Sequence, residues 1–186
     1  MRLGTRRTIA VAAILSIALS SLAAAQSQTK RRLNKQEAPS PTTPADKRDR
    51  VVNAPGSAFN GKAWWQAAAT CGGIYFKLGM VYSDAAIRAK VVKPDPAAYA
   101  SLTKDADGAS KTATAFFDAA ERFLIADRKV ARDEAVMTYD AVASANGDRV
   151  KTADAAVQAA KPCPDLYKTC RGAFPHLCNE TALLTN

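Results

Sequence analysis

The chain has 186 residues, a formal net charge of +9, four cysteines and a single histidine. The charge is unevenly distributed, because residues 58–186 carry 16 basic and 14 acidic side chains and most of the excess lies before them. Nucleic-acid binding depends on a basic surface on the folded domain itself. The composition therefore excludes nucleic acid as the expected partner of this domain.

Residues 1–25 predict a signal peptide. The basic segment MRLGTRR is followed by the apolar run TIAVAAILSIALSSL and by three alanines. This order is what signal peptidases recognise, with cleavage expected near Ala25-Gln26. The apolar run is shorter than the roughly 20 residues that span a bilayer, so no transmembrane anchor is expected after cleavage. The mature protein is predicted to be periplasmic or secreted, and Arg6-Arg7 resembles a twin-arginine signal too loosely to displace the general secretory (Sec) route.

Residues 26–57 predict a disordered basic tether. The stretch is polar, contains four prolines and has no aromatic residue, so it buries too little apolar area to offset its ordering entropy. Two basic clusters within it are candidate contacts for an anionic lipid or cell-wall polymer. They consist of Lys30, Arg31 and Arg32, and of Lys47, Arg48 and Arg50.

Residues 58–160 predict an alanine-rich helical bundle, because apolar residues recur there at three-four spacing. The first helix is expected to start near Ser57, to bend or restart at Ser83-Asp84 and to stop before Pro94. Asp95 is expected to cap the second helix, which should end near residues 125–128. A third helical run is expected to break at Asn146-Gly147.

Residues 161–186 predict a cysteine-rich cap packed on this bundle. Three cysteines lie close together there among three prolines, and one or two helical turns are expected after Pro164. The predicted fold class is therefore all-α, a bundle of three to four helices with a disulfide-stapled C-terminal cap and a disordered N-terminal tether. Alanine is the best helix former but buries little area, so the helices must approach one another closely.

An even number of cysteines in an exported chain predicts two disulfides. Four cysteines allow three connectivities. We predict a disulfide between Cys71 and Cys170, because Cys170 lies in a possible helical turn that can dock on the first helix. We predict the second disulfide between Cys163 and Cys178, which bracket the cap. The two glycines after Cys71 are expected to let the backbone of the cap approach the sulfur.

No cofactor, metal or catalytic residue is predicted. A three-Cys, one-His metal site would use Cys163, Cys170, His176 and Cys178, but their spacing does not match that of structural zinc sites. The chain lacks the Cys-x-x-Cys-His string of covalent haem attachment, and axial methionines could come only from Met80 and Met137. The only histidine lies in the cap, away from any pattern typical of an acid–base pair, so we favour a non-enzymatic role.

An aromatic cluster on the first helix is the candidate interaction patch. It consists of Trp64, Trp65, Tyr75, Phe76 and Tyr82. These residues either form the core or line a groove, and Trp65 is the one expected at the rim of an exposed patch, because adjacent tryptophans point about 100° apart on a helix.

Three functions follow from these patterns. The preferred one is an exported, non-enzymatic helical protein that binds another protein or an envelope component. A carrier of a small apolar ligand, with a pocket between the aromatic cluster and the second helix around Phe116 and Phe117, is an alternative. A hydrolase of the cell envelope, or an inhibitor of one, is another.

Overall fold

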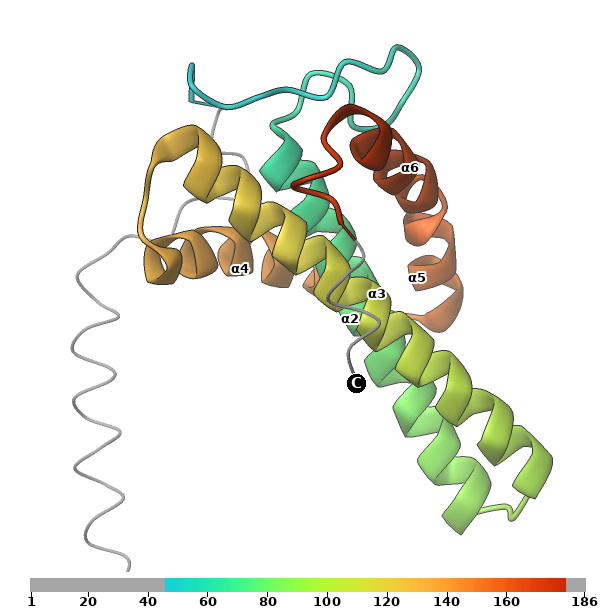
Figure 1. Cartoon of the computed structure of the whole chain (residues 1–186). Helices are drawn as coiled ribbons and strands as arrows, with labels where there is room; N and C mark the ends of the chain where they lie inside the picture. The colour runs from blue at the N-terminus through green and yellow to red at the C-terminus, as the bar shows by residue number, and fades with distance from the viewer. Residues whose placement is uncertain (1–45, 180–186) are drawn as a thin grey trace, which may run out of the picture. The chain divides into compact units, whose positions relative to one another are not determined.

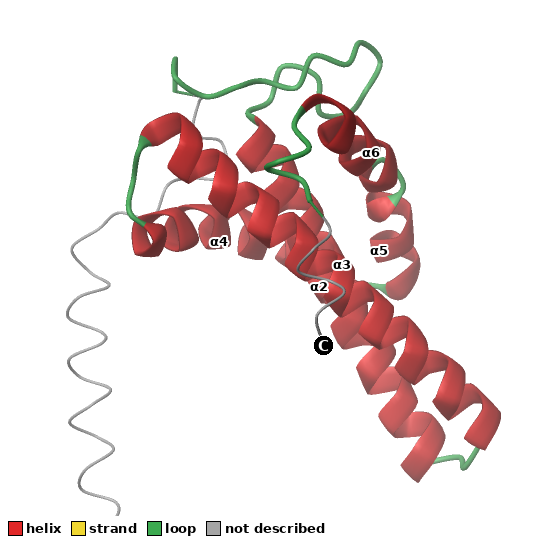
Figure 2. Cartoon of the chain, viewed as in Figure 1, coloured by secondary structure: helices red, strands yellow, loops and turns green. Residues whose placement is uncertain are grey.

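A computed structural model describes residues 46–179, which form an all-helical fold (Figures 1 and 2). The predicted signal peptide, residues 26–45 of the predicted tether and residues 180–186 lie outside the described residues. Four helices pack together and α6 carries the disulfide-bonded cap, which confirms the predicted fold class. The helices are α2 (Trp64–Val91), α3 (Pro96–Arg128), α4 (Arg132–Arg149), α5 (Ala153–Ala160) and α6 (Cys163–Ala173).

The first helix begins later than its sequence pattern predicted. Residues 57–62 form turns, and Gly61 there has a φ of 77°. Hydrogen bonds from Gly61 N–H to Val52 O and from Val52 N–H to Lys62 O, both 2.8 Å, hold these turns to the preceding segment. The chain is thereby kept out of a helix until Trp64. From there α2 runs without a break through Ser83-Asp84, so the predicted bend is absent.

The predicted boundaries of the second helix are confirmed. The Asp95 side chain accepts a hydrogen bond from Ala98 N–H at 2.9 Å, and Pro96 occupies the first turn of α3. The helix ends at Arg128, where Lys129 adopts a left-handed conformation with φ 60°. The break predicted at Asn146-Gly147 is wrong, because α4 continues to Arg149.

Helix α2 packs against each of the other four helices, and glycines bring two of them close. A Cβ atom on Gly72 would overlap the Phe117 ring of α3, and one on Gly73 would overlap the backbone carbonyl of Ala143 in α4. Gly147 faces Gly73 from α4, where a Cβ would lie 3.0 Å from the Gly73 carbonyl oxygen. These glycines therefore admit α3 and α4, and the expectation that they make room for the cap is wrong.

The two predicted disulfides are present, but their connectivity differs from the predicted one. Cys71 is bonded to Cys163 and Cys170 to Cys178, with Cα–Cα distances of 5.7 and 5.9 Å. The first turn of α6 lies against α2, and Cys170 is two turns, or about 10 Å, further along the helix axis. There it meets the returning chain, in which Cys178 N–H donates to Phe174 O at 3.0 Å.

Residues 46–57 are part of the folded domain. Val52 is buried in the main hydrophobic core and Ala54 packs against it, and Val51 pairs with Ala63 in an isolated β-bridge. Trp64 N–H donates to Arg50 O at 2.9 Å, so this segment lies across the start of α2. The tether boundary predicted at residue 57 is therefore too late, because Val52 and the ion-paired side chains of Asp49 and Arg50 attach this polar segment to the bundle.

The two disulfides are expected to differ in their effect on stability. Cys71 and Cys163 close a loop with a sequence separation of 92, whereas Cys170 and Cys178 are eight residues apart. Loop-closure entropy predicts a loss of about 4.5 kcal/mol for Cys71→Ala/Cys163→Ala and about 2.5 kcal/mol for Cys170→Ala/Cys178→Ala. Denaturant unfolding followed by circular dichroism measures both, and equal losses or the reverse order would contradict the assignment.

The close crossing of α2 and α4 is tested by two glycine variants. Gly73→Ala is expected to destabilise the protein by about 3 kcal/mol, because the added methyl group meets backbone that cannot rotate away. Gly108→Ala is the matched control, since nothing lies within 4 Å of a Cβ at that helical position. It should raise the free energy of unfolding by about 1 kcal/mol. A neutral Gly73→Ala variant would show that the two helices are not in close contact.

Candidate functional site

Both tryptophans of the predicted interaction patch are core residues. Trp64 and Trp65 are 3% and 0% exposed. Trp64 stacks on Phe123, with ring centroids 5.8 Å apart, and the Trp65 indole N–H donates to Asp49 Oδ2 at 3.0 Å. The expectation that Trp65 borders an exposed patch is wrong, because the segment around Asp49 covers this side of α2.

Asp49 forms a buried ion pair with Arg128. Arg128 Nε donates to Asp49 Oδ1 at 2.8 Å and Nη2 donates to Oδ2 at 2.6 Å, while the guanidinium lies 5.0 Å from the Trp65 ring centroid. Burial raises the pKa of Asp49, but hydrogen bonds from Arg128 and Trp65 outweigh it, so the net pKa lies below the ordinary value. The same hydrogen bond raises the pKa of Arg128.

Arg50, one of the predicted anionic-surface contacts, is engaged within the fold. Its backbone N–H and Nε donate to the Asp127 carboxylate at 3.0 and 2.6 Å. Its guanidinium lies 5.3 and 5.2 Å from the ring centroids of Phe123 and Phe174. Arg50 therefore anchors the N-terminal segment, with 34% of its side chain still exposed. Its contact with an anionic surface stays a prediction.

Of the other residues in the two basic clusters, some are described by the structure and some are not. Arg48 is exposed and pairs with the neighbouring Asp46 at 2.8 Å, and Lys47 is exposed. A hydrogen bond from Arg48 holds the pKa of Asp46 well below its usual range. Lys30, Arg31 and Arg32 lie outside the described residues.

The remaining aromatic residues of the predicted patch are separated along α2. Tyr75 is half-buried and lines a cleft beside α6, whereas Phe76 is 55% exposed and lines a smaller cleft beside α4 with Met80 and Phe117. Tyr82 packs on a small alanine-rich cluster further along the helix. The five residues therefore do not form one groove.

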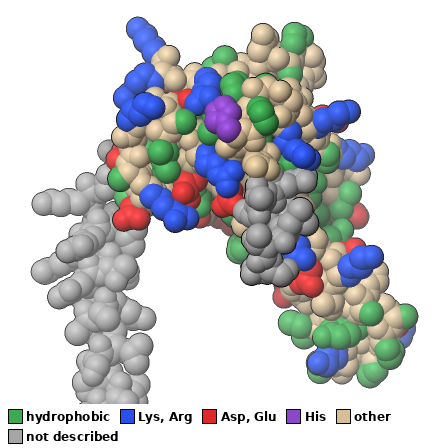
Figure 3. Space-filling view, in the orientation of Figure 1, with side chains coloured by type: hydrophobic (Ala, Val, Ile, Leu, Met, Phe, Trp, Pro, Cys, Tyr) green, Lys and Arg blue, Asp and Glu red, His purple; other side chains and the backbone are tan. Residues whose placement is uncertain are grey.

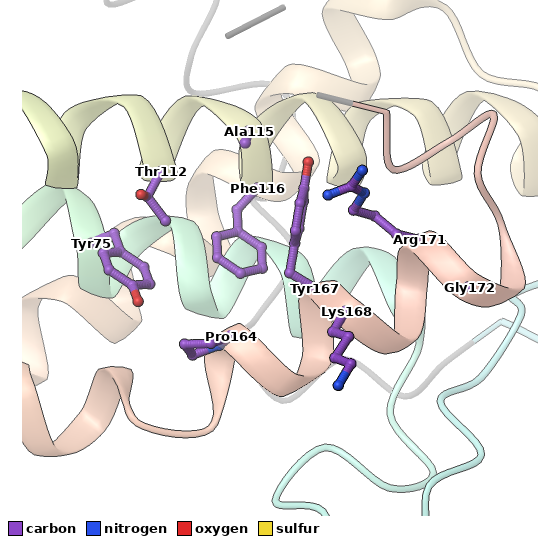
Figure 4. A pocket seen from close by; sticks show the side chains of 9 residues that line it. All are labelled: Tyr75, Thr112, Ala115, Phe116, Pro164, Tyr167, Lys168, Arg171 and Gly172. Carbon is purple, nitrogen blue, oxygen red and sulfur yellow. The ribbon is translucent and has the colours of Figure 1, made fainter. Parts of the chain in front are cut away.

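The larger cleft lies between α3 and α6 and has a volume of about 650 Å³. Phe116 stacks on Tyr75 with ring centroids 5.9 Å apart and meets Tyr167 edge-on at 5.4 Å. Figure 4 shows Phe116 pointing from α3 toward Pro164, between the two tyrosines. The complete lining is Tyr75, Thr112, Ala115, Phe116, Pro164, Tyr167, Lys168, Arg171 and Gly172.

A second feature is the end of the α2–α3 hairpin, which carries exposed apolar side chains. Ile87, Val91 and Val92 are 59%, 70% and 78% exposed. In Figure 1 this end extends past α4, α5 and α6, and Figure 3 shows hydrophobic and basic side chains gathered on it. The basic residues of the same segment are Arg88, Lys90 and Lys93.

The described residues show no catalytic or metal-binding arrangement. Within residues 46–179, no three histidine, cysteine or acidic side chains lie together as metal ligands would. All four cysteines are in disulfides, and His176 is exposed in the turn after α6. The features that remain as candidate sites are the clefts beside α6 and α4 and the end of the hairpin.

Comparison with protein-family models, with characterised proteins and with solved structures finds no significant match to this chain. None of the helices in the described part is both long and apolar enough to cross a membrane. The two disulfides indicate an oxidising, extracytoplasmic environment.

Sequence reasoning missed the hairpin end and half of the α6 cleft. The segment IRAKVVK mixes apolar and basic residues without a helical period, and this mixture was the available signal for an exposed end. Nothing in the sequence placed Tyr167 or Arg171 opposite Phe116, because that contact depends on how α6 docks.

The buried ion pair predicts an acid-sensitive fold. Because folding lowers the pKa of Asp49, its ion pair contributes full stability above the ordinary aspartate pKa, near 4, and loses it as the pH falls through the lower folded value. Asp49→Asn should lower the free energy of unfolding by about 3 kcal/mol at pH 7, since it leaves Arg128 unpaired. The variant should also lose less stability than the parent between pH 5 and pH 3.

Denaturant unfolding at both pH values measures this difference. Asp84→Asn, at an exposed position of α2, is the control and should follow the parent protein. If the Asp49 variant lost as much free energy of unfolding as the parent between pH 5 and pH 3, other carboxylates would govern the acid response.

Proposed function

We propose that this chain is an exported, non-catalytic protein that attaches to the anionic surface of a lipid membrane through the end of its α2–α3 hairpin. The observation that carries the proposal is the exposure of Ile87, Val91 and Val92 at one end of the molecule's longest hairpin. We take the compartment to be the periplasm or the exterior. The signal-peptide pattern supports export, with cleavage near Ala25-Gln26 by the Sec route.

The apolar contribution to membrane binding comes from these three side chains. Fully burying an aliphatic side chain of this size is worth about 1.5–3 kcal/mol. Each is already partly covered in the fold, so insertion of all three supplies about 4 kcal/mol. This is enough for interfacial attachment and far less than a spanning helix provides.

The charges at the hairpin end favour an anionic bilayer over other occupants. Residues 87–93 contain Arg88, Lys90 and Lys93 and no acidic residue. Lys90 lies 5.3 Å from the Tyr99 ring centroid, and its stem covers the side of the hairpin. Each basic residue near an anionic bilayer contributes about 1 kcal/mol. A second copy of the chain would place the same three cations against these, which disfavours self-association there.

The nearest carboxylates offset part of this charge but not all of it. Asp95 is held in the cap of α3 by Ala98 N–H, and Asp84 lies one turn before Arg88 along α2. With these two included, residues 84–95 still carry one net positive charge. With one net charge counted, the apolar and electrostatic contributions together give about 5 kcal/mol, between the roughly 4 kcal/mol of a millimolar and the roughly 8 kcal/mol of a micromolar affinity.

Binding to vesicles tests the proposal. The oxidised protein is sedimented with vesicles of phosphatidylcholine containing 30% phosphatidylglycerol, and with phosphatidylcholine alone. We expect binding to the anionic vesicles that weakens with added salt. Val91→Asp/Val92→Asp should weaken it by about a hundredfold, since two apolar anchors are lost and two like charges are added.

Val157→Asp is the matched control, because Val157 is a 41% exposed valine on α5, away from the hairpin. It should bind the vesicles as the parent protein does. Equal binding to both vesicle types, or an unaffected hairpin variant, would contradict the proposal. Loss of a protein partner from crosslinked cells on the same substitution, without any vesicle binding, would reassign the hairpin end to a protein interface.

A further inference from the structure

We propose that the cleft between α2 and α4 binds a cationic amphipathic helix of another protein. An apolar side chain of that helix packs on Phe76, Met80 and Phe117, and its basic side chains face Asp140 and Asp148. This surface is separate from the hairpin end and does not depend on membrane attachment. It adds a protein partner of defined charge to a chain whose proposed attachment is to a lipid surface.

The cleft exposes large apolar side chains beside the crossing of α2 and α4. Phe76 and Met80 lie one turn apart on α2 and are 55% and 48% exposed. Phe117 of α3 also lines the cleft and stacks on Tyr139 of α4, with ring centroids 5.5 Å apart. Methionine adapts its shape to different partners. A partner that covers this cleft therefore removes apolar area from water.

The size of the cleft suits an anchoring side chain. Its volume of about 280 Å³ lies just below the range of about 300–1,000 Å³ that small-molecule sites occupy. Interfaces between proteins are commonly centred on one or two anchor side chains in such a pocket. The walls are preformed, because α2 and α4 meet at Gly73 so closely that a Cβ atom would overlap the Ala143 carbonyl. A preformed wall reduces the entropy lost on binding.

The walls of the cleft favour a helix over an extended segment. All ten lining residues belong to α2, α3 and α4, whose backbone groups pair within their own helices. An extended segment would therefore bury its N–H and C=O groups without partners. A helix satisfies these groups internally and presents only side chains, as in other complexes that place an amphipathic helix in a groove.

The charged residues of the cleft favour a cationic partner. Asp140 and Asp148 are exposed and line the cleft from α4. They are eight residues apart, which corresponds to about 12 Å along the helix axis. Basic side chains two turns apart on a partner helix have the same spacing. Within residues 46–179, neither carboxylate forms an ion pair with a basic side chain.

The surroundings of the cleft are also acidic. Helix α4 carries four acidic and two basic side chains. Burial raises the pKa of Tyr139, and the nearby carboxylates of Glu121, Asp140 and Asp118 raise it further. Arg132 offsets one of these charges, since it pairs with Glu121 at 2.9 Å. The remaining carboxylates repel the anionic bilayer that the hairpin end favours, so the two surfaces suit different partners.

The probe is a synthetic alanine-based helical peptide of about 15 residues, with lysines two turns apart and two leucines one turn apart between them. One comparison peptide has glutamate in place of every lysine, and another has alanine in place of both leucines. Binding to the oxidised mature protein is followed by amide chemical shifts in NMR, without vesicles. We expect the lysine peptide to shift resonances of α2 and α4 around the cleft and to bind more tightly than either comparison peptide.

The charge of the cleft is tested in both directions. Asp140→Asn/Asp148→Asn should weaken binding of the lysine peptide by about tenfold, the size expected for two exposed ion pairs. Lys77 is the one basic residue among the ten that line the cleft, so Lys77→Gln should strengthen binding by about threefold. Asp105→Asn/Asp165→Asn, at exposed positions outside the cleft, is the matched control and should leave the affinity unchanged.

The apolar contact is tested separately. Phe76→Ser should weaken binding of the lysine peptide by about tenfold, because it removes a large apolar wall of the cleft. Val157→Ser, at an exposed position of α5, is its control and should bind as the parent does. Because Phe76, Asp140 and Asp148 are exposed, these replacements should preserve the melting temperature, which is measured alongside.

Three outcomes would overturn the proposal. They are no binding of the lysine peptide at about 1 mM, equal binding of the lysine and glutamate peptides, and unchanged binding by the Asp140/Asp148 variant. Sedimentation velocity checks a further occupant. Self-association of the protein that Val91→Asp/Val92→Asp abolishes, without peptide binding, would assign the cleft to the hairpin end of a second copy instead. Failure of vesicle attachment would leave this cleft standing, since no membrane is present in the assay.

Discussion

The fold depends on how closely other helices can approach α2. In a chain this rich in alanine, the buried area per residue is small, so stability requires short distances between helix axes. Gly72 and Gly73 provide them, because Phe117 and the Ala143 carbonyl occupy the space that side chains would take. Larger aromatic residues fill the space nearer the start of α2, where Trp64 stacks on Phe123 of α3. Small residues and aromatic rings thus occupy different stretches along one helix.

Local patterns predicted the helices well and their docking poorly. The cap at Asp95 and the stop before Pro94 are properties of neighbouring residues, and both are confirmed. The disulfide partners and the role of Gly147 depend on which turn of one helix meets which turn of another, and sequence spacing does not determine this. Gly147 illustrates the difficulty, since a helix breaker and a helix-crossing glycine look identical until the neighbouring helix is known.

The basic residues were the hardest to interpret, because charge alone does not distinguish an anchor from a contact surface. Arg50 has an acidic partner 77 positions away in sequence and two aromatic rings beside it. Arg128 lies against Trp65 in the same way. The cations of the hairpin end have apolar neighbours that the fold leaves uncovered. Only the three-dimensional arrangement separates these cases, which explains why sequence reasoning did not find that Arg50 is an anchor.

The covalent attachment of α6 has a consequence for where the protein can work. One entire wall of the α3–α6 cleft is held by bonds that form only under oxidising conditions, and one of them joins residues 92 positions apart. Cys163 follows nearly the whole helical bundle in sequence, so that bond can close only after the bundle has been synthesised and has met an oxidising environment. A chain retained in a reducing cytoplasm would have helices but an unsecured cleft. The position of α6 against α2 is in this way tied to completed oxidation of the chain.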